Sequence, residues 1–311
     1  MKAIVLKQPG APGNLQIEEV ATPILKEGDV LIAVKAISIN PVDVKSRAGK
    51  GVYGRIKEES PLILGWDISG VVTESKSPLF KTGDAVFGMV NFPGHGKAYA
   101  EYVAAPASQL ALKPANISHE EAAAATLAAL TAYQALAKHA NVQPGQKVLV
   151  HAAAGGVGHF TVQLAKHLGA YVVGTSSVKN RDFVQQLGAD EHIDYHTFDW
   201  EQATPQFDFV LDTVGGDNID RSLHVTKPGS TLISIPSGLN ETVTEKAKAK
   251  GVNGYFFLVS SNGDDMKALA DYLEQGTLKA HVSESFAFAD MAKAHEQVES
   301  GRTVGKVVVV L

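Results

Sequence analysis

The chain has 311 residues, of which 45% are hydrophobic and 20% charged, and its formal net charge is −5. This size predicts about two domains with full cores, and the acidic balance without a basic run argues against nucleic acid as a partner. The absence of cysteine excludes disulfides, thiolate catalysis and cysteine-ligated zinc. No stretch is long and apolar enough to span a membrane and the start lacks a signal-peptide core, so we expect a cytoplasmic protein with no membrane partner.

Residues 1–115 consist of short apolar runs separated by Pro/Gly turns, a pattern typical of a small irregular barrel or sandwich. Asn40 follows one such run, and Pro41 holds it in an extended conformation. Its amide therefore either projects into a cleft or belongs to an ordinary turn. The expected strands are Ala3–Leu6, Val30–Ala36, Gly70–Thr73, Ala85–Val90 and Glu101–Ala104.

The next segment predicts one long helix. Ala122–Ala137 is rich in helix formers and follows a capping box formed by Ser118 and Glu121. A Pro-Gly turn within Asn141–Gln146 then leads into the second half of the chain.

Lys147–Gly169 predicts a strand, a tight turn and a helix. Small residues stand at three positions of the dinucleotide fingerprint, Ala153, Gly155 and Gly158, although the plain pattern has glycine at the first. Without bulky side chains there, the amides at the helix start can face a diphosphate, whose charge the helix dipole favours. The loop is therefore a candidate dinucleotide site, with an ordinary strand-to-helix turn as the alternative.

The strand Ala170–Thr175 ends where a βαβ unit reads the ribose. An NAD site would show a carboxylate there, but this chain has Ser176 and Ser177, followed by Lys179 and Arg181. Hydroxyls and cations can bind a 2′-phosphate that a carboxylate would repel. We therefore predict NADPH rather than NADH, the alternative being that the two cations are solvated residues at a helix start.

Alternating strands and helices then continue and predict a doubly wound parallel sheet of the α/β class. His192 and His196 lie four residues apart without a third ligand, which favours a solvated or capping role over metal binding. The alternating segments are Phe183–Leu187, Phe207–Asp212, Ile219–Leu223 and Thr231–Ile235, and they are followed by a last strand at Val252–Val259, an amphipathic helix at Met266–Glu274 and a closing strand at Lys306–Val310.

Collinear motifs along nearly the whole chain resemble the zinc-independent, zeta-crystallin-like quinone oxidoreductases of the medium-chain dehydrogenase/reductase superfamily. The resemblance implies a GroES-like β-rich catalytic domain at residues 1–120 and 262–311 and a Rossmann NADPH-binding domain at residues 121–261. It also implies a homodimer. The motifs are IxxNPVD at 37–43, PLILGWDISGVV at 61–72, GDAVFG at 83–88, AYAEYV at 98–103, ATLAALTAYQAL at 125–136, HAAAGGVG at 151–158, LGAD at 187–190, DTVGG at 212–216 and GKVVVVL at 305–311.

The same resemblance bears on metal chemistry. Zinc-dependent members carry a cysteine at the position of Asn40 and a histidine at that of Trp66, and this chain has neither. Without a Lewis acid, the implied reaction is hydride transfer from NADPH to an acceptor that is already electrophilic, a quinone or an α,β-unsaturated carbonyl. Two alternatives stay open: an enoyl-thioester reductase of the same superfamily and a non-catalytic NADPH-binding protein.

Site residues follow from the resemblance. Asn40 would contact substrate or nicotinamide, and Tyr53 is the candidate proton donor, although it can equally be a lid residue while solvent supplies the proton. Thr126 would bond the cofactor unless it is simply a buried helical threonine. The remaining cofactor contacts would be Gly155, Gly156, Val157 and Gly158 at the diphosphate, Ser176, Lys179 and Arg181 at the 2′-phosphate, Asp212, Thr213 and Val214 at ribose and adenine, and Ser234 and Phe257 at the nicotinamide.

Overall fold

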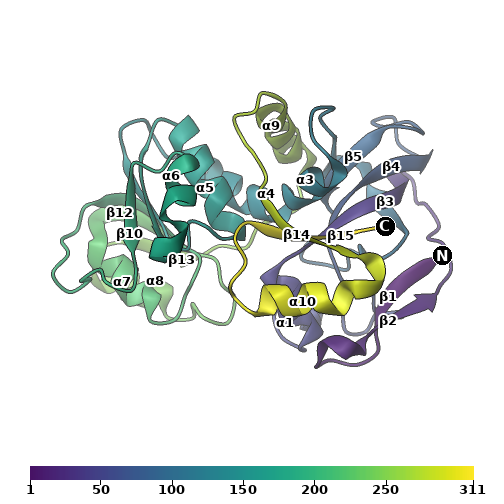
Figure 1. Ribbon diagram of the computed structural model, residues 1–311, viewed down its shortest axis with the longest axis horizontal. Helices are drawn as coiled ribbons and strands as arrows, with labels where there is room; N and C mark the ends of the chain where they lie inside the picture. The colour runs from purple at the N-terminus through teal and green to yellow at the C-terminus, as the bar shows by residue number, and fades with distance from the viewer. The chain divides into compact units, whose positions relative to one another are not determined.

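The computed structural model describes residues 1–311 and divides into two compact units, shown in Figure 1. The split unit comprises Met1–Leu130 and Val259–Leu311, and the central unit comprises Thr131–Leu258. The resemblance implies domain boundaries at residues 120 and 261, whereas the compact units meet after Leu130 and after Leu258. Helix α3 (His119–Ala124) packs on the sheet of the split unit.

The split unit contains a seven-stranded sheet in the order β14-β15-β3-β4-β5-β7, with β6 also paired to β3, and a separate ladder of β1 and β2. Pairing in the large sheet is antiparallel except between β14 and β15. The strands are β1 (Lys2–Leu6), β2 (Leu15–Glu19), β3 (Asp29–Ile39), β4 (Asp67–Ser75), β5 (Ala85–Met89), β6 (Tyr102–Pro106), β7 (Leu110–Leu112), β14 (Val282–Ala287) and β15 (Lys306–Val310).

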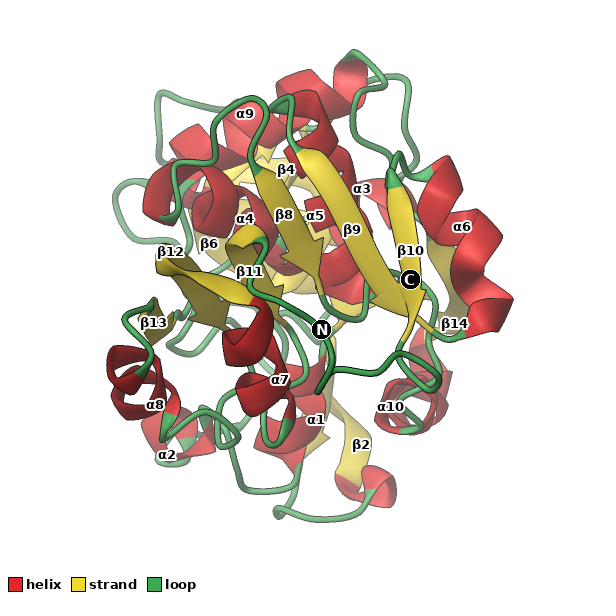
Figure 2. Cartoon of the chain, turned by 90° about the vertical axis from the view of Figure 1, so that its left-hand side faces the viewer, coloured by secondary structure: helices red, strands yellow, loops and turns green.

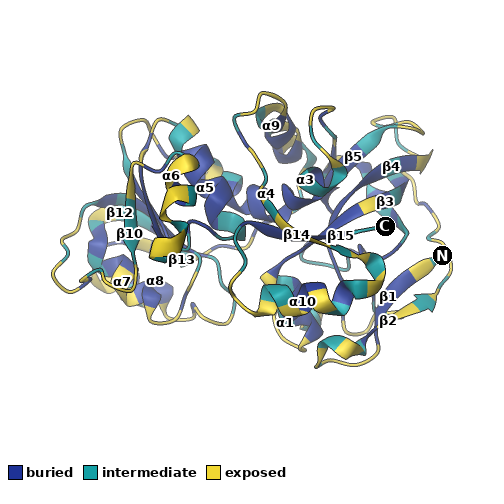
Figure 3. Cartoon of the chain, viewed as in Figure 1, coloured by how far each residue is buried: buried dark blue, intermediate teal, exposed yellow.

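Strand β15 occupies an interior position of this sheet although it ends the chain. Its valines at 307, 308 and 309 are fully buried, and Figure 3 colours this strand and its neighbours by burial. A run of β-branched residues without polar alternation suits a strand covered on both faces. The predicted closing strand is confirmed with the same bounds.

Helices of the split unit include two that the sequence did not predict near Asn40, α1 (Pro41–Arg47) and α2 (Tyr53–Ile56). Proline at the first helical position and an acidic residue in the first turn favour a helix start. The predicted amphipathic helix is α9 (Gly263–Glu274), whose N-cap Asn262 accepts a hydrogen bond from the Asp265 amide, and α10 (Met291–Glu299) completes the set.

The prediction of one helix over Ala122–Ala137 is wrong. Three segments stand there: α3, α4 (Leu127–Tyr133) and a wider π-type turn at Gln134–His139. The Leu127 amide donates to Asp67 Oδ1 (3.1 Å), and the Thr126 hydroxyl donates to Ala123 O (2.7 Å), so the helical bond expected between residues 127 and 123 is replaced. The predicted capping box of Ser118 and Glu121 is confirmed in both directions.

The central unit is a six-stranded sheet in the order β10-β9-β8-β11-β12-β13, with every neighbouring pair parallel. Figure 2 looks onto this sheet, with β8, β9 and β10 side by side. The order reverses direction between β8 and β11, which is the topological switch point of a doubly wound fold. The strands are β8 (Lys147–Val150), β9 (Tyr171–Ser176), β10 (Glu191–Asp194), β11 (Phe207–Asp212), β12 (Thr226–Ser234) and β13 (Asn253–Phe256).

Helices connect these strands. Because parallel crossovers are right-handed, the reversal of strand order places α5 and α6 on one face and α7 and α8 on the other, as Figure 1 shows. Strand residues such as Leu149 and Val210 pack with Leu223 of α7 and Val243 of α8 in one buried cluster. The α/β fold class is confirmed, with α5 (Gly156–His167), α6 (Arg181–Gln186), α7 (Asn218–Val225) and α8 (Val243–Ala249) as its helices. No helix of the chain has the length and apolar character needed to cross a membrane.

Candidate active site

The glycine loop of the central unit joins β8 to α5 by a close backbone approach. A Cβ on Gly158 would overlap the carbonyl oxygen of Ala152 and lie 2.8 Å from Ala153 Cα, so only glycine fits. Ala152 itself has a left-handed φ of 47°, which makes the tight turn. Because Ala152 takes the left-handed conformation, the next position does not need glycine, and the first glycine of the fingerprint can be Ala153.

The start of α5 leaves backbone donors for a ligand. Gly155 donates to Ala152 O (2.8 Å), and the bond from His159 N to Gly155 O (3.0 Å) opens the helix. The amides of Gly156, Val157 and Gly158 therefore lie in the first turn, where no helical acceptor precedes them. Three donors at a positive helix end, with no side chain larger than valine, fit a diphosphate.

The end of β9 carries the residues expected at the 2′-phosphate. Ser176 is buried, and its hydroxyl donates to Ser177 O (3.0 Å) and contacts His192 Nε2 (2.8 Å), while Lys179 and Arg181 are exposed. Burial, followed by the nearby Arg181 charge, lowers the pKa of His192. The structure therefore brings His192 from β10 into this group, a neighbour that its sequence spacing with His196 did not indicate.

Asp212, at the end of β11, is fully buried and organises the loop after it. Its carboxylate accepts hydrogen bonds from the amides of Val214 (3.0 Å) and Gly215 (3.1 Å), from Asn218 Nδ2 (2.9 Å) and from Ser234 Oγ (3.2 Å). The carboxylate is thus committed to the chain's own donors. Within the predicted ribose contacts, this leaves the exposed Val214 and the loop backbone to meet a ligand.

One further residue, His151, shapes the same edge of the sheet. His151 is buried at the end of β8, where its Nδ1 contacts Thr175 Oγ1 (3.2 Å) and its carbonyl accepts from Thr213 Oγ1 (2.7 Å). Burial lowers the pKa of His151 to about 4, so the ring is neutral at pH 7. It ties the ends of β8, β9 and β11 together, although the glycine motif that contains it suggested no role.

The predicted nicotinamide contacts lie along β12 and β13. Phe257 is buried, its amide donates to Ser234 O (3.1 Å), and its ring lies 4.4 Å from that of His139. Ser234 is itself fully buried, with its hydroxyl turned to Asp212. The side chains of Ser234 and Phe257 therefore lie beneath the surface at this edge of the central sheet.

In the split unit, Asn40 is buried and its carboxamide is engaged at both ends. Asn40 Oδ1 accepts from Lys306 Nζ (2.5 Å), and Asn40 Nδ2 donates to Asp67 Oδ2 (2.7 Å). Lys306 also donates to Ile39 O (3.0 Å) and is only 3% exposed. We call Asn40, Asp67 and Lys306 the lysine cluster.

A second group of buried polar side chains meets the lysine cluster at the Asn40 backbone. The Asn40 amide donates to Asp43 Oδ2 (2.8 Å), and Asp43 Oδ1 accepts from the Tyr99 hydroxyl (2.9 Å), which also contacts His295 Nε2 (2.9 Å). Burial and then the Asp67 charge raise the pKa of Asp43 to about 7, whereas burial lowers the pKa of His295 to about 3. The imidazole is therefore neutral at pH 7, and Asp43 holds a proton over much of the acidic range.

These side chains do not fit a zinc ion. A buried ammonium donates to the Asn40 oxygen, and a cation next to it would be repelled. Trp66 Nε1 donates to Gly94 O (2.7 Å), so this side chain offers no ligand atom. No group of three or more His, Asp or Glu side chains in the chain could hold a metal ion.

Three more residues of the split unit bear on the site. Tyr53 is half-buried and begins α2, while Thr126 is fully buried and its hydroxyl donates to Ala123 O. Lys45 of α1 is half-buried, and burial lowers its pKa. Sequence analysis missed Lys45, since its only signal there is a lysine two residues after Asp43.

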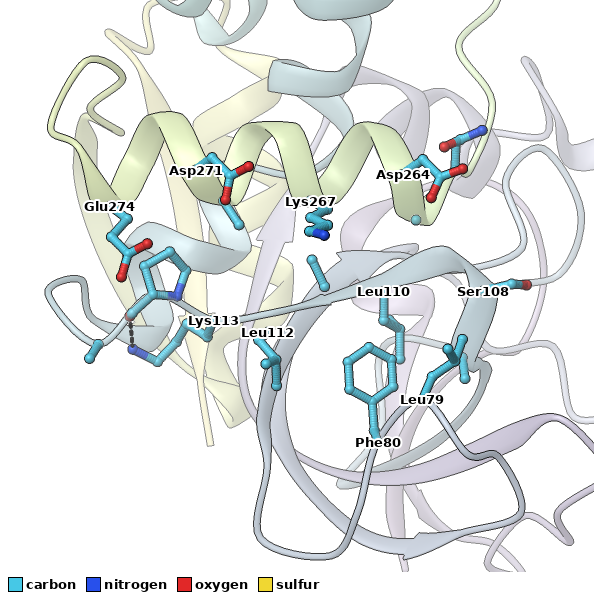
Figure 4. A pocket seen from close by; sticks show the side chains of 17 residues that line it. Leu79, Phe80, Ser108, Leu110, Leu112, Lys113, Asp264, Lys267, Asp271 and Glu274 are labelled. Carbon is cyan, nitrogen blue, oxygen red and sulfur yellow. Dashed lines mark hydrogen bonds between the residues drawn. The ribbon is translucent and has the colours of Figure 1, made fainter.

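The split unit also contains a cavity of about 790 Å³ between α9 and β7, drawn in Figure 4. Apolar side chains such as Phe80 and Leu110 face charged ones such as Lys267 and Asp271 across it. None of the predicted site residues lines this cavity.

Comparison with protein families gives two matches. Residues 26–115 match the alcohol dehydrogenase GroES-like domain, and residues 187–309 match the zinc-binding dehydrogenase family. The second family name mentions zinc, but where zinc-dependent members carry a cysteine ligand this chain has Asn40, whose side chain is bound within the lysine cluster.

Individual relatives extend over the whole chain. The 2-methylene-furan-3-one reductase of Solanum lycopersicum is 36% identical over 99% of this chain and 79% of its own length. The chloroplastic NADPH-dependent alkenal/one oxidoreductase of Arabidopsis thaliana is 35% identical with the same coverage. The structure of the quinone oxidoreductase from Coxiella burnetii matches with a TM-score of 0.94 and 37% identity, over 100% of this chain and 99% of that one. The chain therefore belongs to the medium-chain dehydrogenase/reductase superfamily, as its motifs indicated.

Proposed function

We propose that this protein is an NADPH-dependent oxidoreductase that transfers a hydride to a quinone or an α,β-unsaturated carbonyl without a metal. The observation that carries this proposal is the buried Lys306 ammonium on Asn40, because it leaves no Lewis acid to activate an alcohol. An acceptor that is already electrophilic needs none. The names of the Solanum, Arabidopsis and Coxiella relatives support the same class of reaction.

Cofactor binding is assigned mainly to the central unit, with Thr126 of the split unit as a further candidate contact. The amides of Gly156, Val157 and Gly158 would hold the diphosphate, and Lys179 and Arg181 the 2′-phosphate beside Ser176, with Thr213 and Val214 toward ribose and adenine. When bound, NADPH supplies the hydride. Buried Ser234 and Phe257 would support the wall beside the nicotinamide, and Thr126 would lie near it.

Acceptor chemistry is assigned to the split unit. Asn40 would orient the acceptor or the nicotinamide, and Tyr53 is the candidate proton donor to the enolate that hydride addition produces. Lys45 is a candidate to stabilise negative charge on the acceptor oxygen, because a half-buried ammonium interacts more strongly than an exposed one.

The first experiment tests the reaction. The purified protein is mixed with NADPH and a panel of 1,4-quinones, alkenals and enoyl thioesters, and the loss of reduced-nicotinamide absorbance is followed. We expect turnover of quinones or alkenals that persists after dialysis against a chelator. Preferential turnover of enoyl thioesters would favour the enoyl reductase alternative, and tight NADPH binding without any turnover would favour a non-catalytic protein.

The second experiment tests the residues. We expect NADPH to bind at least about tenfold more tightly than NADH, and Arg181→Ala to remove most of that preference, since a charged hydrogen bond contributes roughly 1.5–3 kcal/mol. Glu201→Ala, an exposed change elsewhere in the central unit, is the control. Equal dissociation constants for the two cofactors would refute the assignment, and unchanged turnover in Tyr53→Phe would remove Tyr53 as the donor.

We also propose a homodimer that acts in the cytoplasm. β13 is an edge strand with an unpaired side, and exposed apolar side chains lie on or near it, including Phe256 (39% exposed) and Leu258 (36%). Free strand edges favour pairing with a second chain. Light scattering on the eluted protein should give twice the chain mass, and cell fractionation tests the location.

A further inference from the structure

Three strands bring distant residues of the split unit to one corner of its sheet. Val307 of β15 pairs with Ile39 of β3, and Ser38 pairs with Asp67 of β4. Lys306 and Asp67 therefore lie on either side of the end of β3, where Asn40 follows. All three side chains are less than 4% exposed.

The chemistry of this corner allows one orientation of the Asn40 carboxamide. An ammonium can only donate hydrogen bonds, so the oxygen of Asn40 must face Lys306, and the amino group must face the Asp67 carboxylate. A flip would place the amino group against a cation and the oxygen against an anion. The charges on both sides also polarise the amide and make its N–H a stronger donor.

Asp67 extends the same contacts to the helix break. Its second oxygen accepts from the Leu127 amide (3.1 Å), which interrupts the helix at Thr126. The ammonium thus stands at one end of a continuous path through Asn40 and Asp67 to the segment that carries Thr126. Asn40 and Thr126 are two of the residues assigned above to the reacting groups.

We propose that Lys306 is a positioning residue that holds the Asn40 carboxamide in a single, polarised orientation for the reaction. The inference rests on the proposed function, because it takes Asn40 to border the acceptor or the nicotinamide. Lys306 acts through Asn40 and touches neither ligand. The last strand of the chain therefore contributes to the reaction as well as to the sheet.

The direct test observes the Asn40 amide by ¹H–¹⁵N NMR. The side-chain signals are assigned by their loss in Asn40→Ala, and in the wild type we expect two separate signals protected from exchange with solvent. Lys306→Met should move them and remove the protection. Arg302→Met, an exposed cation close to β15, is the matched control and should leave them unchanged.

Kinetics supply the second readout. We expect Lys306→Met to lower kcat by about 10- to 100-fold, the size of effect seen when a residue that orients a metal ligand is lost, with the NADPH dissociation constant unchanged. Because Lys306→Met leaves Asp67 buried without a cation, the double variant Lys306→Met, Asp67→Asn removes both charges and should stay folded with a kcat equally low. Lys306→Arg, which keeps the charge, should recover part of it.

Two outcomes would overturn the inference: unmoved Asn40 signals in folded Lys306→Met, or a kcat within about twofold of the wild type, which is below any positioning effect of the expected size. If the wild-type protein reduces no acceptor, the proposed function fails. The Asn40 signals then decide alone whether Lys306 orients the amide.

Discussion

The glycine loop and the lysine cluster are two polar regions of one molecule that are built in different ways. The loop uses backbone amides from a single stretch of chain, and its shape depends on a missing side chain at Gly158. The lysine cluster uses the buried side chains of three residues that are far apart in sequence, with Lys306 and Asp67 each hydrogen-bonded to Asn40 between them. Backbone amides do not titrate, so the loop should keep its shape when pH changes and lose it when a side chain fills the space at Gly158. A buried cluster of charged side chains is instead sensitive to protonation.

The largest expected effect concerns Asp43, beside the lysine cluster. Its pKa is about 7 in the folded protein and near the ordinary 3.8 in the unfolded chain, so between these values the folded state binds more protons. Asp43 therefore lowers stability as pH rises from 4 to 7, by an amount of the order of 4 kcal/mol. Asp43→Asn should abolish this part of the dependence.

Chemical denaturation of the wild type and Asp43→Asn at several pH values measures it. The wild type should lose stability relative to the variant as pH rises through this window, and the difference should level off above pH 7. A difference that does not vary with pH would show that Asp43 is ionised in the fold throughout.

The next effect belongs to the glycine loop. Gly158→Ala should destabilise the protein by about 3 kcal/mol, because the added methyl group overlaps the Ala152 carbonyl and must push α5 from the turn. Its NADPH affinity should fall with the displaced amides. Gly54→Ala, where a Cβ meets nothing within 4 Å, is the control. Thermal melts and fluorescence titration measure both quantities, and a Gly158→Ala protein as stable as the wild type would contradict the close approach.

The smallest effect comes from a local feature of the split unit. Ser118 Oγ accepts a hydrogen bond from the Glu121 amide (3.1 Å) at the start of α3. Ser118→Ala should therefore lower the free energy of unfolding by about 1 kcal/mol near pH 7. Ser285→Ala, an exposed serine on β14, should cost less than about 0.5 kcal/mol. If the two variants denature alike, the capping box contributes nothing measurable.

The same contrast explains what the sequence could predict. The strand, the small residues and the helix of 147–169 are contiguous, so local spacing was sufficient to place them and the α/β fold around them. The capping box and the closing strand were predictable for the same reason. The contacts of these residues with a cofactor remain predictions.

The lysine cluster carries no such local signal. Lys306 opens an apolar strand in the sequence, and only strand register shows that it meets Asn40. The helix predicted over Ala122–Ala137 failed because Asp67, about sixty residues earlier, takes the Leu127 amide, an acceptor that helix propensity does not include. His192 joined Ser176 through the pairing of β10 with β9 in the same way.

The place of β15 has a consequence for biosynthesis. The central unit is one uninterrupted segment, Thr131–Leu258, so all of its strands are synthesised before β15. The split unit lacks an interior strand, and the Asp67 carboxylate lacks its cation, until Lys306–Val310 emerges. The central sheet can therefore form during translation before the sheet of the split unit has received β15.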